Sequence, residues 1–189
     1  MKTKRSFHLS RLIWTVILFV FFQGCVSLPV SPPGTKPVIT DAFINKEKGI
    51  YGSVLKIYLK AEDPKGSMFK IFTVVDQVGY GRYFPDTIYV EPPCQHDLKG
   101  YLQWNTFSFR AARLPEWTQI TIQVSVTDTG GNESNTVVFP FEFVSEAVPE
   151  SPLPSPFNQG NIPRLGYLNI NLVNPFERED EEHRFRKEP

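Results

Sequence analysis

The stretch that most constrains the fold is a hairpin pattern late in the chain, from Ile120 to Phe143. Apolar and polar residues alternate over Ile120–Thr127, and the alternation returns over Val137–Phe143. Side chains two residues apart point to the same face of a strand, so each half predicts a strand with one buried face. Between the halves, Asp128–Asn132 contains two glycines and residues that tolerate a left-handed backbone. This segment therefore predicts a reversal of the chain and an antiparallel hairpin.

Five further segments between residues 38 and 109 carry strand patterns, separated by turn residues. With the hairpin they give about seven strands in roughly 105 residues, which is the size and spacing of an all-β sandwich. These segments are Val38–Ile44, Val54–Glu62, Met68–Asp76, Thr87–Glu91 and Tyr101–Phe109.

Three details refine this prediction. Met68–Asp76 is apolar on both faces, which predicts a central strand. The apolar phase of Tyr101–Phe109 shifts near Asn105, which predicts a β-bulge there. Pro140 has no N–H to donate, so its strand is expected at a sheet edge or at a bulge.

Two turn segments resemble a known group of domains. Val126–Ser134, VTDTGGNES, resembles the V-x-D-x-x-G-N-x-S found near the end of bacterial immunoglobulin-like and fibronectin type III-like modules. Leu59–Gly66, LKAEDPKG, is similar to the A-x-D-P-x-G that follows an early strand in the same group. The resemblance implies a single immunoglobulin-like β-sandwich over residues 38–144. The paired cysteines of antibody-type domains are missing, so the resemblance is to the disulfide-free bacterial branch.

The amino-terminal residues have the pattern of a targeting signal. Residues 1–11 contain four basic residues and no acidic one, and an apolar run follows from Leu12 to Phe22, which predicts an export signal. The next residues, Gln23-Gly24-Cys25, resemble the end of a bacterial lipoprotein signal peptide. The resemblance implies that Cys25 is acylated, that residues 1–24 are removed, and that fatty acids such as palmitate anchor the chain. An uncleaved signal anchor remains an alternative, because Leu12–Val30 holds nineteen residues without a charge.

Both alternatives place the rest of the chain outside the cytoplasm. In a bacterium with two membranes, Val26 after the cysteine resembles outer-membrane sorting, so we expect the protein at the outer membrane, facing the periplasm. Residues 25–37 are proline-rich and predict a semi-rigid tether.

Without residues 1–24 the chain keeps sixteen of its twenty basic and all twenty acidic residues, a net charge of −4. We therefore expect no nucleic-acid partner.

Residues with catalytic chemistry are few. Cys94, His96 and Asp97 are near neighbours in sequence, whereas catalytic groups are assembled in space from separate segments. Two soft ligands are also fewer than the four of a structural zinc site. We expect no catalytic residue, no metal and no cofactor, and hence no enzyme, although an exported enzyme remains the alternative class.

Calcium is a second alternative, as in an adhesion-type module. The turns at Asp63 and Asp128 are expected at the same end of the sandwich. Asp63, Asp128, Asn132 and Glu133 would then supply oxygen ligands. Ordinary turn chemistry accounts for the same residues, so the sequence leaves calcium open.

The expected partner contact is the aromatic group Tyr80, Tyr83, Phe84 and Tyr89. Tyrosine combines an apolar ring with a hydroxyl at low entropic cost, which suits protein or carbohydrate recognition. The alternative is that these rings cover the sandwich. With the anchor, this predicts a non-enzymatic binding or structural module of the cell envelope that contacts another envelope protein or a surface polymer.

After Val144 the composition changes. Residues 145–189 form a proline-rich linker and a charged tail, which predicts a largely disordered segment. Tyr167–Val173 alternates like one isolated strand, and a lone strand is not stable by itself. Leu168, Ile170 and Leu172 are therefore expected to dock on an exposed sheet edge of this domain, to add to a partner's sheet, or to remain largely disordered.

Overall fold

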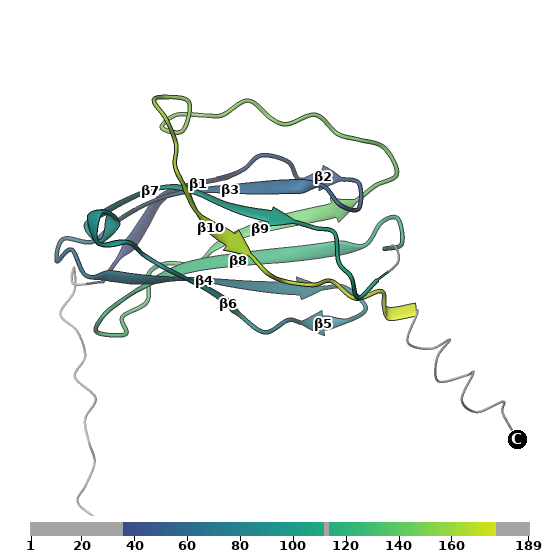
Figure 1. Ribbon diagram of the computed structural model, residues 1–189, viewed down its shortest axis with the longest axis horizontal. Helices are drawn as coiled ribbons and strands as arrows, with labels where there is room; N and C mark the ends of the chain where they lie inside the picture. Colours follow the sequence, from purple (N-terminus) through teal and green to yellow (C-terminus); the bar gives the residue numbers. More distant parts are fainter. Residues whose placement is uncertain (1–35, 112–113, 177–189) are drawn as a thin grey trace, which may run out of the picture. The chain divides into compact units, whose positions relative to one another are not determined.

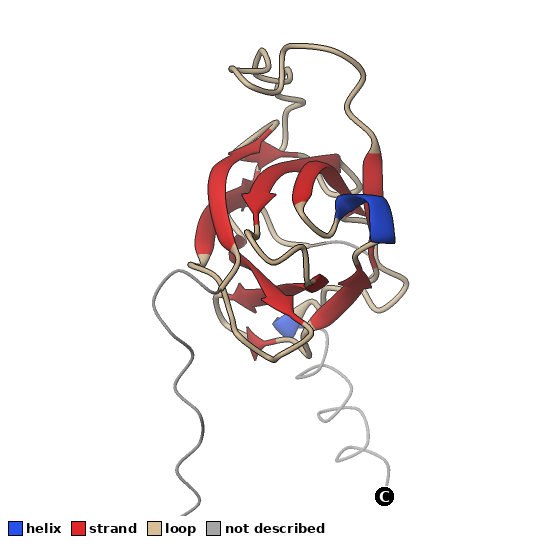
Figure 2. Cartoon of the chain, turned by 90° about the vertical axis from the view of Figure 1, so that its left-hand side faces the viewer, coloured by secondary structure: helices blue, strands red, loops and turns tan. Residues whose placement is uncertain are grey.

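The computed structural model describes residues 36–111 and 114–176, and within these ranges the chain forms two sheets packed face to face (Figures 1 and 2). The first sheet has the order β1-β3-β7-β10. Its strands are β1 (Val38–Ile44), β3 (Val54–Glu62), β7 (Asp97–Asn105) and β10 (Arg164–Leu168). The second sheet has the order β2-β9-β8-β4-β5, and β6 also pairs with β4. Its strands are β2 (Lys48–Gly49), β4 (Met68–Gln77), β5 (Gly81–Arg82), β6 (Asp86–Tyr89), β8 (Gln119–Asp128) and β9 (Val137–Phe143).

The strand order is that of an immunoglobulin-like sandwich. Strands β1, β3 and β7 take the places of strands A, B and E, while β4, β8 and β9 take those of C, F and G. Strand β6 lies beside β4, as strand C′ does in variable-type domains. The predicted all-β, immunoglobulin-like fold is confirmed.

The predicted hairpin is the β8–β9 pair. Ile120 lies opposite Phe141, and Ile122 lies opposite Phe139, so the apolar residues of both strands share one face. Gly131 supplies the turn with a left-handed backbone (φ +78°). The inward residues of both sheets form one core; its largest fully buried members are Trp104, Phe141, Phe143, Leu55, Ile57, Leu59, Met68, Ile71, Leu98, Leu102 and Ile120.

Two of the detailed predictions hold. Strand β4 is central, because β8 pairs with one of its edges and β5 and β6 with the other. Strand β9 lies near a sheet edge, since its second neighbour is only the two-residue β2. Glu142 donates its N–H to Glu47 on that outer side, and Pro140 faces the same side by alternation. The missing N–H of Pro140 therefore costs no bond to β8.

The predicted bulge near Asn105 is wrong. Strand β7 begins earlier than expected, at Asp97, and ends at Asn105. The chain then leaves the sheet, with the Thr106 N–H donating to the carbonyl of Ser53 at 3.0 Å. The apolar phase shifts because Phe107 belongs to a loop and not to a distorted strand.

The segment after β9 packs on the sandwich. Phe157 is 2% exposed and covers Tyr58 on the outer face of the first sheet, with ring centroids 5.6 Å apart. The chain then runs beside β7 as the parallel strand β10. Leu168, Ile170 and Leu172 are buried, so the structure selects docking for this part of the tail. Residues 177–189 lie outside the described residues.

Candidate contact surface

The four aromatic residues expected to contact a partner do not share one surface. Tyr83 is 8% exposed, and its hydroxyl donates to Gln77 Oε1 and accepts the Val173 N–H. Burial raises the pKa of Tyr83 to about 12. Tyr80 is half-buried and stacks on Tyr83, with centroids 4.7 Å apart. Both rings therefore belong to the packing of the sandwich.

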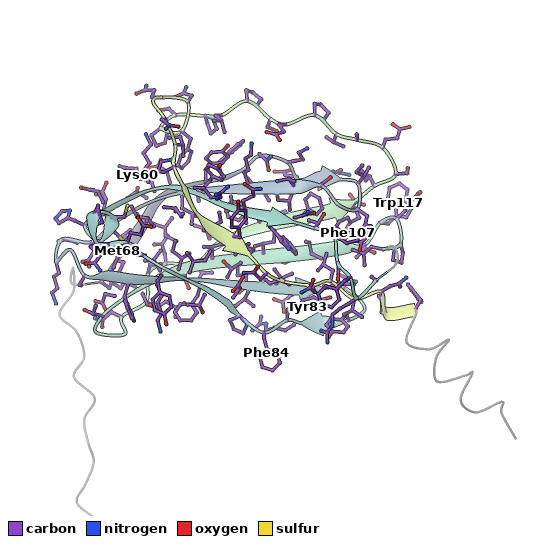
Figure 3. All side chains as sticks on the ribbon, in the orientation of Figure 1. Lys60, Met68, Tyr83, Phe84, Phe107 and Trp117 are labelled. Atoms are coloured by element: carbon purple, nitrogen blue, oxygen red, sulfur yellow. The ribbon has the colours of Figure 1, made fainter. Side chains whose placement is uncertain are left out.

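The other two residues are exposed in different places. Phe84 is 95% exposed and projects from the ribbon, whereas Tyr83 points inward (Figure 3). Tyr89 packs edge-on against Phe69, and the Lys70 ammonium lies 5.2 Å from its ring. The ring of Tyr89 is thus engaged with neighbours on its own sheet.

A larger group of exposed apolar residues lies at one end of the sandwich. It gathers where β4, β7 and β9 end and where β3 and β8 begin. We call it the apolar pole, and Figure 3 marks two of its members. Its residues are Val78 (69% exposed), Phe107 (60%), Phe109 (80%), Trp117 (68%) and Phe176 (64%).

Hydrogen bonds at the strand ends bring the first half of the apolar pole together. Val78 follows β4 and donates its N–H to the carbonyl of Gln119. Trp117, just before β8, donates its N–H to the carbonyl of Phe143 at 2.8 Å. A loop that leaves β4 and a loop that enters its neighbour β8 thus place Val78 and Trp117 at the same end of the second sheet.

Tyr51 holds the second half of the apolar pole, Phe107 and Phe109, which lie on the loop after β7. Its hydroxyl accepts the Ser108 N–H at 2.9 Å and lies 2.7 Å and 2.8 Å from the carbonyl oxygens of Ser108 and Ala111. The Tyr51 ring also contacts the Phe107 ring, with centroids 5.7 Å apart. Ser108 and Ala111 are buried, which leaves Phe107 and Phe109 pointing outward on an ordered loop.

Trp117 has a second unusual property. Its φ is +68°, the left-handed region that residues other than glycine rarely occupy. Such a conformation costs about 1–3 kcal/mol and clusters at functional sites. Trp117 combines this backbone with an indole ring that is 68% exposed, although tryptophan is on average a highly buried residue. Exposed apolar groups of this kind mark contact surfaces.

The sequence signals concealed this surface. Alternation placed Phe107 and Phe109 in a strand, and Trp117 lies outside every predicted strand. The usable signal was the density of large apolar residues between Asn105 and Gln119, a stretch that contains Pro115 and no continuous period of two.

The opposite end of the sandwich holds the two acidic turns. The Thr129 N–H donates to the carbonyl of Ser67 at 2.9 Å, so both turns lie at the same end, as expected. Asp63 accepts the N–H groups of Lys65 and Ser67 and the hydroxyl of Ser67. Burial alone would raise the pKa of Asp63, but these hydrogen bonds lower it below its ordinary value.

Asp128 is engaged in the same way. Its two oxygens accept the backbone and side-chain N–H groups of Asn132, both at 2.8 Å. The carboxylates thus hold their own turns. Within the part of the chain that the structure describes, no cluster of three or more His, Cys, Asp or Glu residues is arranged to hold a metal.

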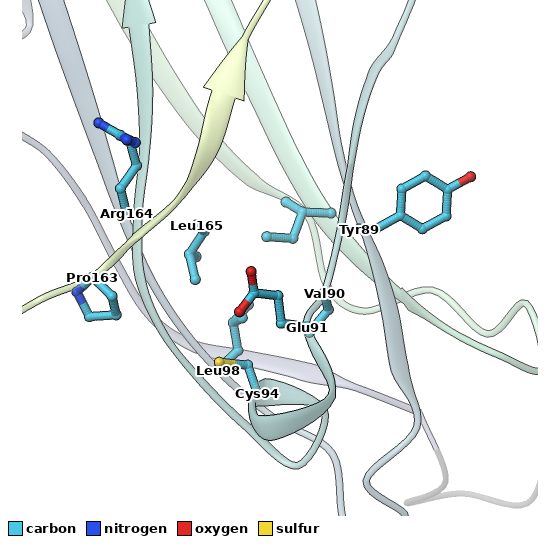
Figure 4. Close-up of a pocket in the computed structure, with 9 residues that line it drawn as sticks. Tyr89, Val90, Glu91, Cys94, Leu98, Pro163, Arg164 and Leu165 are labelled. Atoms are coloured by element: carbon cyan, nitrogen blue, oxygen red, sulfur yellow. The ribbon is translucent and has the colours of Figure 1, made fainter.

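Cys94, His96 and Asp97, the near neighbours in sequence, do not assemble into a catalytic group. Cys94 is a free thiol that lines a small cavity of about 70 Å³, together with Glu91, Leu98 and Leu165 (Figure 4). His96 and Asp97 are exposed, and their nearest polar atoms are 3.4 Å apart. The His96 ring lies beside Gly66. The three side chains do not form a nucleophile–base pair.

Cys25 lies outside the described residues. Between residues 36 and 176, leaving out 112 and 113, no helix is long and apolar enough to cross a membrane.

Comparisons with known proteins assign no family. No protein-family model and no curated protein matches the chain. Among solved structures it is similar to the CARDB domain of a Pyrococcus furiosus protein in complex with di-metal ions, at 10% identity and a TM-score of 0.34, over 61% of this chain and 100% of that chain. It is also similar to the β-glucuronidase of Parabacteroides merdae, at 12% identity and a TM-score of 0.34. That match covers 57% of this chain and 13% of the enzyme.

Proposed function

We propose that this protein is a lipid-anchored, extracytoplasmic lipoprotein that acts as a non-enzymatic binding module of the cell envelope. The observation that carries the proposal is the position of the apolar pole. The described chain starts at Lys36, beside the end of β3 at Glu62, and the apolar pole lies at the other end of the sandwich. A tether from Cys25 to Lys36 would therefore join the domain at the end of the sandwich that does not carry the apolar pole.

The chemistry of the apolar pole suits a protein or polymer surface. Aromatic rings bury a large apolar area, and Trp and Phe are enriched where such contacts form. Arg110 and Glu116 are exposed on the same two loops and supply polar groups for a rim. Tyr51 fixes the loop of Phe107 and Phe109, so little conformational entropy is lost on binding.

A cross-linking pull-down from envelopes tests the contact surface. Phe109→Ser with Trp117→Ser should lower recovery of the cross-linked partner by about tenfold or more, since each ring contributes 1 kcal/mol or above at a buried contact. Phe84→Ser with Tyr89→Ser is the matched control, because it also removes two exposed rings. Equal recovery from both double variants rules out the apolar pole as the contact.

The anchor is tested separately. Cys25→Ser removes the thiolate that would accept the lipid, so incorporation of labelled fatty acid should be lost and the precursor should accumulate. Unchanged labelling would contradict a lipid on Cys25. If Cys25 is acylated but the apolar-pole variants recover the partner normally, the proposed localisation is kept and the proposed binding surface is rejected.

A further inference from the structure

The segment from Arg164 to Asn174, which we call the strap, fills a groove between the two sheets. On one side β10 pairs in parallel with β7. On the other side the Asn169 N–H donates to the carboxylate of Asp86, in β6, at 2.6 Å. The apolar side chains of the strap alternate into the core, as those of a strand within a sandwich do; they are Leu168 (5% exposed), Ile170 (7%) and Leu172 (0%).

Two glycines make room for the strap. A Cβ atom at Gly100 in β7 would lie 2.5 Å from Cγ of Leu165 and 2.8 Å from the carbonyl oxygen of Pro163. A Cβ atom at Gly166 would lie 2.8 Å from Cγ2 of Ile88 in β6. Glycine in a strand often marks the close approach of another backbone. The groove is therefore fitted to an extended backbone.

Buried polar groups in the groove depend on the backbone of the strap. Trp104 donates its indole N–H to the carbonyl of Ile170 at 3.1 Å. Gln77 donates its amide N–H to the carbonyl of Val173 at 2.8 Å, and Tyr83 accepts the Val173 N–H at 2.9 Å. An empty groove would leave the Trp104 indole N–H and the Gln77 amide N–H without these partners, which is costly for buried groups, and Tyr83 would keep only its bond to Gln77. The groove requires a strand as its occupant.

None of these contacts requires that the strap and the groove belong to the same chain. The connector, residues 145–163, contains no strand, and Phe157 is its one buried side chain, all nineteen residues being described. Extended, it spans about 63 Å. The longest strands of the sandwich span about 34 Å. The connector is long enough to carry the strap to a neighbouring molecule.

We propose that the groove also accepts the strap of a second copy of this chain, so that two molecules exchange straps. Reciprocal exchange recreates every groove contact in both molecules, and only the connector changes its path. The balance between the closed monomer and the exchanged dimer then depends on protein concentration. The partner predicted for this groove is an extended strand with apolar residues at alternate positions.

Binding of a separate strap peptide to protein with a cut connector tests whether the groove accepts a strap from another molecule. A site-specific protease sequence replaces residues 158–162 in the otherwise full chain, and the cut protein is mixed with excess fluorescent peptide of residues 164–176. We expect about one peptide per domain to remain bound through size exclusion. A peptide with Leu168→Asp and Leu172→Asp should be retained at about one tenth of the wild-type amount or less, because its binding would bury two charged carboxylates. A Tyr167→Asp peptide is the control, since Tyr167 is 50% exposed.

Equal retention of the wild-type and double-Asp peptides overturns the proposal. The second copy is tested with two uncut full chains that carry different affinity tags, incubated together at high concentration. Recovery of both tags on either resin, suppressed by excess wild-type peptide, supports exchange. Recovery of a single tag at every incubation time contradicts a second copy as the occupant, even where the peptide binds.

Discussion

The indole N–H of Trp104 donates a 3.1 Å hydrogen bond to the backbone carbonyl of Ile170, 66 residues further along the chain. Trp104 is 1% exposed, and Ile170 is 7% exposed, so bulk water has little access to this bond. The bond joins the C-terminal end of β7 to a segment beyond the immunoglobulin-like strands. The strap is therefore part of the core of this domain.

Replacing Trp104 with Phe should lower the free energy of unfolding by about 1–3 kcal/mol. The change keeps an aromatic ring but leaves the carbonyl of Ile170 unpaired in a buried site. Urea denaturation measures the effect. Trp117→Phe is the control, because that ring is exposed, and it should change the free energy by no more than about 0.5 kcal/mol. A loss of equal size in both variants would contradict a specific role for the Trp104 bond.

Leu172→Ala should be more costly. The side chain is fully buried, and truncation of a buried leucine costs about 2–5 kcal/mol through lost transfer energy and the cavity that remains. Its neighbour Asn171 is half-buried, and Asn171→Ala should stay within about 0.5 kcal/mol. If the midpoints of thermal unfolding for the two variants coincide, the strap does not contribute to the core.

Strand patterns were predictable because one-sided burial leaves a period of two in the sequence. Val38–Ile44 and Val54–Glu62 match β1 and β3 from end to end. The docking of Leu168, Ile170 and Leu172 on this domain was one of three open alternatives, beside addition to a partner's sheet and disorder, since composition alone does not show that β7 has a free edge. In the structure β7 has such an edge, and Gly100, which has no side chain, leaves room for the strap beside it.

The contact surface was harder to predict. Tyr83 was expected at the surface, but the groups that bury its hydroxyl include Val173, ninety residues away. No local pattern records such a contact. Phe107 and Phe109 are two residues apart, as apolar residues of one strand face would be, although β7 ends at Asn105, so this spacing suggested burial where the chain forms a loop.

Asp63 makes folding stability depend on pH. Burial raises the pKa of its carboxyl, the hydrogen bonds from Lys65 and Ser67 lower it, and the net pKa lies below the ordinary 3.8. A folded-state pKa below the unfolded one stabilises the protein above the unfolded pKa, and this stabilisation is lost as the pH falls through the folded pKa. Asp63→Ala should cost about 1–2 kcal/mol at neutral pH, as for the loss of a capping residue.

The pH dependence is checked by urea unfolding of both proteins between neutral pH and acid. The difference between wild type and Asp63→Ala should shrink once the pH falls below about 4. Lys65→Ala is the control, since only its backbone N–H bonds Asp63 and its side chain is exposed. A difference that stays constant with pH would show that the charge on Asp63 does not contribute.

Site-specific photo-cross-linking in intact cells tests whether the apolar pole contacts a partner. A photoactivatable phenylalanine analogue replaces Phe109, which is 80% exposed within the apolar pole, or Phe84, which is 95% exposed outside it. We predict a discrete cross-linked species from position 109 and none from position 84. The same species from both positions, or a species from position 84 alone, would contradict the apolar pole as the contact surface of this protein.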